Sequence, residues 1–443
     1  MIGREVELAM LSGLLDKAIA AASPQFALVL GEAGIGKSRL VREFFRSIDA
    51  RPEMLCNWRQ GRRPPYGAGL AYTTLREIVG AHAGIAAGEP PAVTERKLRQ
   101  AVGEDGLDEW LVDRLRPLFG LPGAPSGRGE NLAAWTRFFE GIARSRPAVV
   151  VIEDLHRASE PTLEFLEHFA RRASGVPLLL VGTARPEFLV AHRSILEQLP
   201  ALTRVGLKSL SWAETSRPAQ ALAPRSGAGA LAGRVAEQCG GNPLFAEELA
   251  RFLAEEGGAA HPATGNGHDA PMSLLTLIAA RLDASSPEHK QVLADASVVG
   301  AVFWPAAAAA VGETGLDDVL AGLTHLEERE FIRRHAGSPL EGETELAFWH
   351  ALVRDVAYEQ LPRSSRAVRH VRAARWLESR TRAGEDFIDV IALHYATGLK
   401  LAPASNESEQ AGLSPDAREP AGERRVRAAR ADRPSPACPH VLR

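Results

Sequence analysis

Apolar residues are spaced in two different ways in the first half of this chain. Continuous apolar runs at 26–30, 148–152 and 177–181 are typical of parallel strands whose two faces are both buried. Between these runs, apolar positions recur every three or four residues, as on one face of an amphipathic helix. The predicted helices are residues 1–24, 39–45, 132–143 and 162–172. This alternation predicts an α/β fold with a parallel sheet between two layers of helices.

The second half of the chain has a helical pattern almost throughout. Two short runs, 331–334 and 345–348, flank a turn at 337–342 and predict a hairpin. Helices that end in a hairpin favour a winged helix. The helical pair that we predict next, as the start of an all-α repeat region, covers residues 365–380 and 386–399.

A glycine-rich segment after the first strand fits the pattern G-x-x-x-x-G-K-[ST]. Its sequence is Gly31-Glu32-Ala33-Gly34-Ile35-Gly36-Lys37-Ser38, and Arg39 follows it. In such a P-loop, glycines let backbone N–H groups close around nucleotide phosphates, and the next helix directs its positive end at them. Lys37 would reach the β- and γ-phosphates, and Ser38 would bind Mg²⁺. The alternative is a glycine-rich turn followed by an ordinary lysine.

Acidic residues end the second apolar run. Residues 148–152 lead directly into Glu153 and Asp154. This is the form of a Walker B site, in which one carboxylate holds Mg²⁺ and another orients the attacking water. The third run ends in Thr183 and Arg185, where this architecture senses the γ-phosphate. We predict catalytic roles for the P-loop lysine, both acids and this arginine. The alternatives are an acidic loop and a surface arginine.

Further motifs, in the same order along the chain, are similar to those of bacterial STAND-type P-loop ATPases. They are Trp58-Arg-Gln-Gly61, Pro65-Tyr-Gly67, Glu153-Asp-Leu-His156, Thr183-Ala-Arg-Pro-Glu187, Gly240-Gly-Asn-Pro-Leu244 and the stretch from Phe348 to Tyr358. This region occurs in large LuxR-type regulators and beside class III adenylate/guanylate cyclase domains. The resemblance implies a nucleotide-gated signalling switch that uses ATP or ADP with Mg²⁺.

The resemblance also implies roles for three residues outside the P-loop and the acidic pair. Arg4, in a hydrophobic-Gly-Arg-Glu segment, would lie beside the nucleotide base. Pro243 would pack on the adenine, and His350 would touch the β-phosphate of ADP in a closed state. The simpler alternatives are an ordinary helix start at Pro243 and a structural histidine at position 350.

The chain departs from its relatives at two of these motifs. Relatives often carry Trp and Asp where this chain has Arg157 and Ser159, and Cys-Leu-Pro-Tyr-Gly where it has Arg63-Pro-Pro-Tyr-Gly67. We therefore expect nucleotide binding with slow ATP hydrolysis. The alternative functions are the ATPase portion of a cyclase-associated protein and a LuxR-type regulator without its DNA-binding domain. We expect no cyclase domain here, because only about two dozen residues precede the first strand.

The composition of the chain limits its number of domains, its binding partners and its cellular compartment. A chain of 443 residues with 45% hydrophobic content suggests two to four domains, and a formal charge of −3 gives no general attraction to nucleic acid or anionic membranes. Cys56, Cys239 and Cys438 are too few and too scattered for a disulfide framework. We expect a cytoplasmic protein without membrane contact. Its expected partners are ATP, an unidentified protein or small-molecule inducer, and a second copy in the ATP state.

The patterns together predict seven segments. They are an N-terminal helix (1–24), a P-loop NTPase domain (25–206), a helical lid (207–256), a flexible linker (257–271), a winged-helix-like domain (272–361), a repeat-like helical pair (362–400) and a disordered tail (401–443). Because relatives continue into a repeat array, we expect a truncated or frame-altered chain.

Arginines recur every third residue from Arg363 to Arg375, and we expect a solvated or partner-facing surface there rather than nucleic-acid contact.

Overall fold

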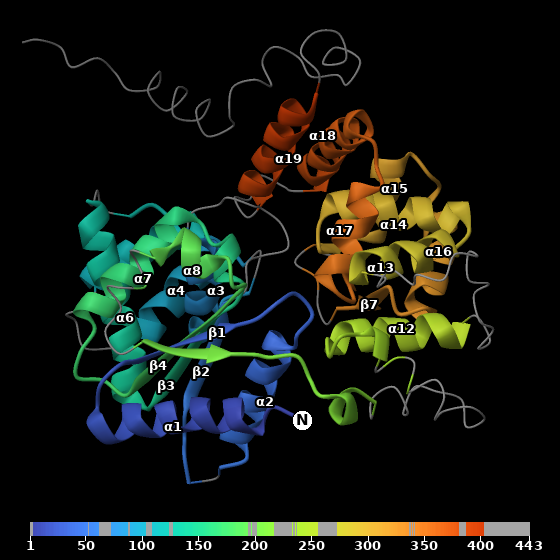
Figure 1. Cartoon of the computed structure of the whole chain (residues 1–443). Helices are drawn as coiled ribbons and strands as arrows, with labels where there is room; N and C mark the ends of the chain where they lie inside the picture. Colours follow the sequence, from blue (N-terminus) through green and yellow to red (C-terminus); the bar gives the residue numbers. More distant parts are fainter. Residues whose placement is uncertain are drawn as a thin grey trace, which may run out of the picture. The chain divides into compact units, whose positions relative to one another are not determined.

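The computed structural model describes residues 3–51, 53–61, 72–86, 89–102, 109–123, 127–193, 196, 202–216, 233, 235, 237–255, 273–335, 338, 340, 342–380 and 387–402 (Figure 1). Two compact units divide the chain after Ala284, and each is described by itself. The predicted linker, the motif Pro65-Tyr-Gly67 with Arg63, and the predicted tail beyond residue 402 lie outside the described residues.

Five parallel strands form the sheet of the first unit, in the order β2-β3-β4-β1-β5. They are β1 (Gln25–Leu30), β2 (Asn57–Gly61), β3 (Ala148–Ile152), β4 (Leu178–Ala184) and β5 (Leu202–Gly206). Strands β1, β3 and β4 are buried along their whole length, as their continuous apolar runs predict. The predicted parallel α/β sheet is confirmed.

Helices cover both faces of this sheet (Figure 1). They are α1 (Glu5–Ala21), α2 (Lys37–Asp49), α3 (Thr73–Ala83), α4 (Pro91–Val102), α5 (Glu109–Leu115), α6 (Arg128–Ser145), α7 (Glu160–Arg172) and α8 (Phe188–Ala191). Side chains alternate along a strand, so Ala27 of β1 packs in the apolar cluster of α1 and α2. Its neighbour Phe26 packs on the other face, edge-on to Phe169 of α7.

The carboxyl ends of three neighbouring strands meet at one edge of the sheet. Leu30 of β1 pairs with Ala184 of β4, and Ile152 of β3 pairs with Gly182 of β4. The P-loop follows β1, the acidic pair follows β3 and Arg185 follows β4. The topology therefore brings these three segments to the same edge, which is where open α/β sheets bind their ligands.

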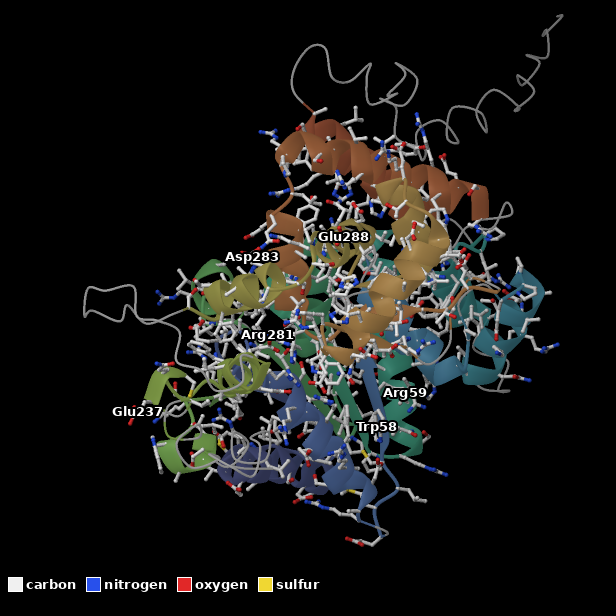
Figure 2. The ribbon with its side chains drawn as sticks, turned by 90° about the vertical axis from the view of Figure 1, so that its right-hand side faces the viewer. Trp58, Arg59, Glu237, Arg281, Asp283 and Glu288 are labelled. Atoms are coloured by element: carbon white, nitrogen blue, oxygen red, sulfur yellow. The ribbon has the colours of Figure 1, made fainter. Side chains whose placement is uncertain are left out.

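Both edge strands were absent from our prediction. We interpreted residues 55–82 as an irregular connection, but Asn57–Gly61 forms β2, which is the outer neighbour of β3. Four of its five residues are only half-buried, so the strand lacks an apolar run. Its one large apolar residue, Trp58, which is labelled in Figure 2, stacks on Phe45 of α2. Edge strands of this kind depend on a partner strand, which sequence periodicity does not reveal.

Two helices at the end of the first unit pack on each other. They are α12 (Pro243–Glu255) and α13 (Leu274–Asp283). Leu277 of α13 lies in the apolar cluster of α12, and the almost fully buried Arg281 and Glu248 form an ion pair between the two helices. Figure 2 labels Arg281 on α13. We had placed a boundary before residue 272, whereas this packing keeps α13 with the first unit.

The second unit is helical around a small antiparallel sheet of order β6-β8-β7. Its strands are β6 (Val302–Phe303), β7 (Ile332–Arg334) and β8 (Leu346–Phe348), and its helices are α14 (Pro287–Val299), α15 (Pro305–Gly312), α16 (Leu316–Glu328), α17 (Ala351–Glu359), α18 (Arg363–Arg380) and α19 (Ile388–Leu401). Strands β7 and β8 are the two antiparallel strands that the sequence predicted. Leu401, which we had placed in the tail, ends α19. None of the described helices combines the length and apolar content needed to cross a bilayer.

Arginines in this unit bond to carbonyl groups at the carboxyl ends of helices. Arg354 donates to Ser297 of α14, Arg372 to Val311 of α15, Arg366 to Glu359 of α17 and to Leu361, and Arg363 to Lys400 and Leu401 of α19. These carbonyls lack helical partners and carry partial negative charge, so a guanidinium satisfies and stabilises them. Three arginines of the predicted basic stripe, Arg363, Arg366 and Arg372, thus bond to such carbonyls within the chain.

Two buried histidines join α18 and α19. His370 Nδ1 lies 2.8 Å from His394 Nδ1, and His370 Nε2 lies 2.8 Å from the Tyr358 hydroxyl. Burial lowers the pKa of His370 to about 2 and that of His394 to about 4, and the charges of Arg354 and Arg366 add to the effect at His370. The neutral pair can share one proton between its Nδ1 atoms, whereas a doubly charged pair would repel.

We predict that the chain loses stability as the pH falls from about 6.5 towards 4.5. In this window the unfolded histidines bind protons while the folded pair stays neutral, so the loss is of the order of 2 kcal/mol of unfolding free energy per histidine. Thermal unfolding followed across this range measures the effect. The double variant His370→Gln/His394→Asn should show a shallower dependence, and an unchanged slope would contradict the assignment.

Candidate functional site

The P-loop connects β1 to α2 through two glycines in the left-handed region. Gly34 has φ +79° and Gly36 has φ +104°. Residues with a side chain rarely adopt these backbone angles. A Cβ at Gly36 would meet no atom within 4 Å, so the angle and not the space favours glycine there. Turns of this kind direct successive N–H groups into a concave surface that suits an anion. The loop therefore has the backbone geometry of a phosphate site.

Lys37 is the first residue of α2 and folds back over the loop. Its Nζ donates to the carbonyls of Gly31 at 2.7 Å and Glu32 at 2.9 Å. Burial is the main influence on its pKa and lowers it, the charge of Asp154 opposes this, and the charge of Arg185 lowers it further. The structure thus brings Lys37, Asp154 and Arg185 into one electrostatic environment, as the sequence predicted.

Ser38 and Glu153 face each other across the site. The Ser38 hydroxyl lies 3.2 Å from Glu153 Oε2, so an oxygen from the P-loop side meets an oxygen from the β3 side. Mg²⁺ that binds with nucleotide phosphates commonly takes only one or two protein oxygens and fills its other positions with water and phosphate. These two groups fit such an ion.

Glu153 has a second partner that our sequence analysis missed. Gln60, on edge strand β2, donates from Nε2 to Glu153 Oε1. It lies two residues after Trp58, on the same face of the strand, so the packing of Trp58 on α2 also directs Gln60 towards the site. Gln60 belongs to the Trp58-Arg-Gln-Gly61 motif, and this was the available signal.

Asp154 occupies an uncommon backbone conformation. Its φ is +54°, which costs on the order of 1 kcal/mol for a residue with a side chain. Its N–H donates to the Thr183 hydroxyl at 3.0 Å, and Thr183 is almost fully buried. Thr183 therefore orients the backbone of Asp154, and its role as a γ-phosphate sensor stays a prediction.

His156 is a further group to which the sequence analysis assigned no role. Burial lowers its pKa, the charge of Asp154 raises it, and the charges of Arg185 and Lys37 lower it. It is therefore uncharged at neutral pH beside three charged groups of the site. Its membership of the Glu153-Asp-Leu-His156 motif was the only hint.

Arg4, the residue immediately before α1, bonds to the P-loop through its side chain. Its guanidinium is 4% exposed and donates to the carbonyls of Ile35 at 3.2 Å and Lys208 at 2.7 Å, with Glu7 as a third partner. The side chain of Ile35 is buried in the core beneath the loop. The structure thus brings Arg4 to the P-loop, where it bonds to the backbone.

The turn before α12 also bonds to the P-loop. Asn242 donates from Nδ2 to the Ala33 carbonyl at 2.9 Å, and the Leu244 N–H donates to the Gly34 carbonyl at 3.3 Å. Pro243, between them, is the first residue of α12. The predicted lid motif and the P-loop are therefore adjacent within the first unit.

The other predicted residues fall in two places. Arg39 lies in the first turn of α2, next to Ser38. His350 immediately precedes α17 in the second unit. Its predicted contact with a nucleotide phosphate stays a prediction.

Known proteins resemble the chain over the P-loop unit and beyond it. Residues 1–181 match the AAA ATPase domain family. An uncharacterized protein of Rhizobium meliloti (strain 1021) is 28% identical over 393 residues, which cover 84% of this chain and 36% of that protein. The chain thus spans about a third of the length of this curated relative.

A solved structure has a similar fold. It is the crystal structure of a Signal Transduction ATPase with Numerous Domains (STAND) protein with a tetratricopeptide repeat sensor from Pyrococcus horikoshii. The TM-score is 0.53 at 15% sequence identity, and the match covers 91% of this chain and 48% of that chain. The family match over residues 1–181, this fold and the P-loop geometry together support a P-loop ATPase region.

We predict that Gln60→Leu raises the rate of ATP hydrolysis about three- to tenfold, the equivalent of one net hydrogen bond. Gln60 donates to one oxygen of Glu153, and its replacement by leucine removes that competing hydrogen bond. Steady-state phosphate release measures the rate, and ATP affinity should change less than about twofold. Glu153→Gln is the control and should abolish hydrolysis. A slower Gln60→Leu enzyme would mean that Gln60 instead orients Glu153 for catalysis.

Proposed function

We propose that this chain is an ATP/ADP-binding switch of the STAND type that hydrolyses ATP slowly. The supporting observation is the contact between the two halves of the site, in which the Ser38 hydroxyl lies 3.2 Å from Glu153, with the half-buried Lys37 next to Ser38 in the chain. A lysine, a helix amino end and a magnesium site in one place are what a nucleotide triphosphate requires.

Each group of the site has a role in this proposal. The N–H groups of the loop and Lys37 bind the phosphates, and Ser38 with Glu153 holds Mg²⁺, which would offset phosphate charge. Asp154 and Glu153 are the carboxylates that can orient the attacking water. Arg185, which follows β4 at the same edge of the sheet, would respond to the γ-phosphate. Arg157 and Ser159 stand where relatives carry Trp and Asp, and this supports slow turnover.

The regulatory part of the proposal concerns the lid and the second unit. Pro243 would pack on the adenine, and the antiparallel strands and helices of the second unit would act as a winged helix whose His350 contacts the β-phosphate of ADP. ADP would favour a closed form, and ATP an open form able to associate. To shift such a switch from about 1:99 to 99:1, the two nucleotides must differ in preference by roughly 5.5 kcal/mol.

Direct nucleic-acid binding is not part of this proposal. Arg363, Arg366 and Arg372 of the predicted basic stripe bond to helix ends, and Arg369 pairs with Asp295 at 2.6 Å. These contacts favour a structural role over phosphate contacts with DNA.

We predict that Lys37→Ala abolishes tight nucleotide binding, because it removes the ammonium that would bind the phosphates. The measurement is the nucleotide content of the purified proteins together with phosphate release. Wild type should retain ADP and release phosphate slowly, and the variant should do neither. Equal nucleotide binding by the two proteins would refute the P-loop assignment, and rapid steady turnover by wild type would favour a working ATPase over a switch.

We predict that His350→Ala weakens ADP binding about tenfold, the value of a charge-assisted hydrogen bond, and leaves ATP binding unchanged. Titration of each nucleotide into the purified protein measures both affinities. His325→Ala is the matched control, since His325 is 46% exposed on α16. Equal losses for ATP and ADP, or no loss, would assign His350 a structural role.

A further inference from the structure

Five consecutive carbonyl groups of the P-loop each accept a hydrogen bond. Lys37 donates to Gly31 and Glu32, Asn242 to Ala33, the Leu244 N–H to Gly34 and Arg4 to Ile35. Lys37 belongs to the phosphate-binding machinery itself. The last three carbonyls are held by groups from outside the loop, which lie at positions 4, 242 and 244.

These bonds control where the N–H groups of the loop point. In a planar trans peptide the C=O and the following N–H point in opposite directions. The Ala33 carbonyl shares a peptide unit with the Gly34 N–H, and the Ile35 carbonyl shares one with the Gly36 N–H. Holding these two carbonyls therefore sets the direction of two N–H groups at the glycines whose φ is positive.

Asn242 uses both ends of its amide for this purpose. Its Oδ1 accepts from the N–H groups of Leu244 at 3.1 Å and Phe245 at 3.2 Å and so caps α12, while its Nδ2 donates to Ala33. The fit is close, because a Cβ at Gly34 would lie 2.8 Å from Leu244 Cβ and 2.9 Å from Asn242 Oδ1.

The turn that carries Asn242 is itself fixed to the segment after β5. The Leu210 N–H donates to the Gly241 carbonyl at 2.8 Å, and a Cβ at Gly241 would lie 2.3 Å from the Leu210 carbonyl oxygen. Arg4 is anchored to this same segment through the Lys208 carbonyl. Arg4 and the turn that carries Asn242 are thus both bonded to the segment after β5, which supports their positions.

We propose that Arg4 and Asn242 are positioning residues for phosphate binding, which act by holding the Ile35 and Ala33 carbonyls and so orienting the Gly36 and Gly34 N–H groups. The inference rests on the proposed function. It assigns Arg4 to the phosphate end of the ligand, whereas the family resemblance implied a contact with the base.

Tripolyphosphate tests this assignment, because it has the phosphates of ATP and no base. Arg4→Leu should weaken binding of Mg²⁺-ATP and Mg²⁺-tripolyphosphate by the same factor of about tenfold, and Arg4→Lys, which keeps one donor, should recover part of it. Both affinities come from calorimetric titration of one protein sample, so a partly folded variant affects them equally. A loss confined to ATP would overturn the inference and place Arg4 at the base.

Asn242→Asp tests the second residue without removing the helix cap. Aspartate caps a helix as well as asparagine does, but it cannot donate to the Ala33 carbonyl. We expect both ligands to bind about tenfold more weakly, with little change in thermal stability. The control is Ser273→Ala, which removes the cap of α13 and should lower stability while leaving both affinities unchanged. Wild-type affinities in Asn242→Asp would overturn the inference.

Failure of the proposed function gives a different result. If wild type bound neither ATP nor tripolyphosphate, or if Lys37→Ala bound both normally, the phosphate site itself would be refuted and the inference with it. If Lys37→Ala abolished binding while Arg4→Leu and Asn242→Asp left both affinities intact, only the positioning roles would fail.

Discussion

A loop that binds phosphate has to present its N–H groups to an anion while its carbonyl oxygens, which would repel that anion, are turned away. Here the carbonyls from Gly31 to Ile35 all have hydrogen-bond partners, and the two positive-φ glycines allow the necessary turns. The strand before the loop, the helix after it and the turn before α12 hold the loop in this arrangement. The conformation of the loop therefore depends on tertiary contacts as well as on its own sequence.

The same need to satisfy carbonyl groups organises the second unit by other means. Four of its helices end beside an arginine from another segment, and each guanidinium meets carbonyls that have no helical partner. The neutral pair of His370 and His394 fastens α18 to α19 in the same unit. In this part of the chain the guanidinium groups of Arg354, Arg363, Arg366 and Arg372 therefore serve the packing of helices.

Local sequence patterns predicted those parts of the site that are formed by residues contiguous in the sequence. The P-loop, the acidic pair and the three central strands were predicted because an apolar run, a glycine spacing and a strand end are each contiguous in sequence. The edge strand β2 was missed because Asn57–Gly61 has one large apolar residue and depends on pairing with β3. Because this strand was missed, Gln60 was missed as well. Its contact with Glu153 joins residues that are 93 positions apart.

Sequence alone determined the α/β class, the phosphate loop and the identity of the groups with chemistry to offer, because these depend on residue type and short spacing. Only the tertiary structure decided that Arg4 bonds to the loop backbone, that Asn242 bonds to Ala33 across 209 positions, and that Thr183 holds Asp154 in a left-handed conformation. The physical reason is that a hydrogen bond between distant segments depends on where the packed sheet and helices bring them, and a one-dimensional pattern carries no such distance.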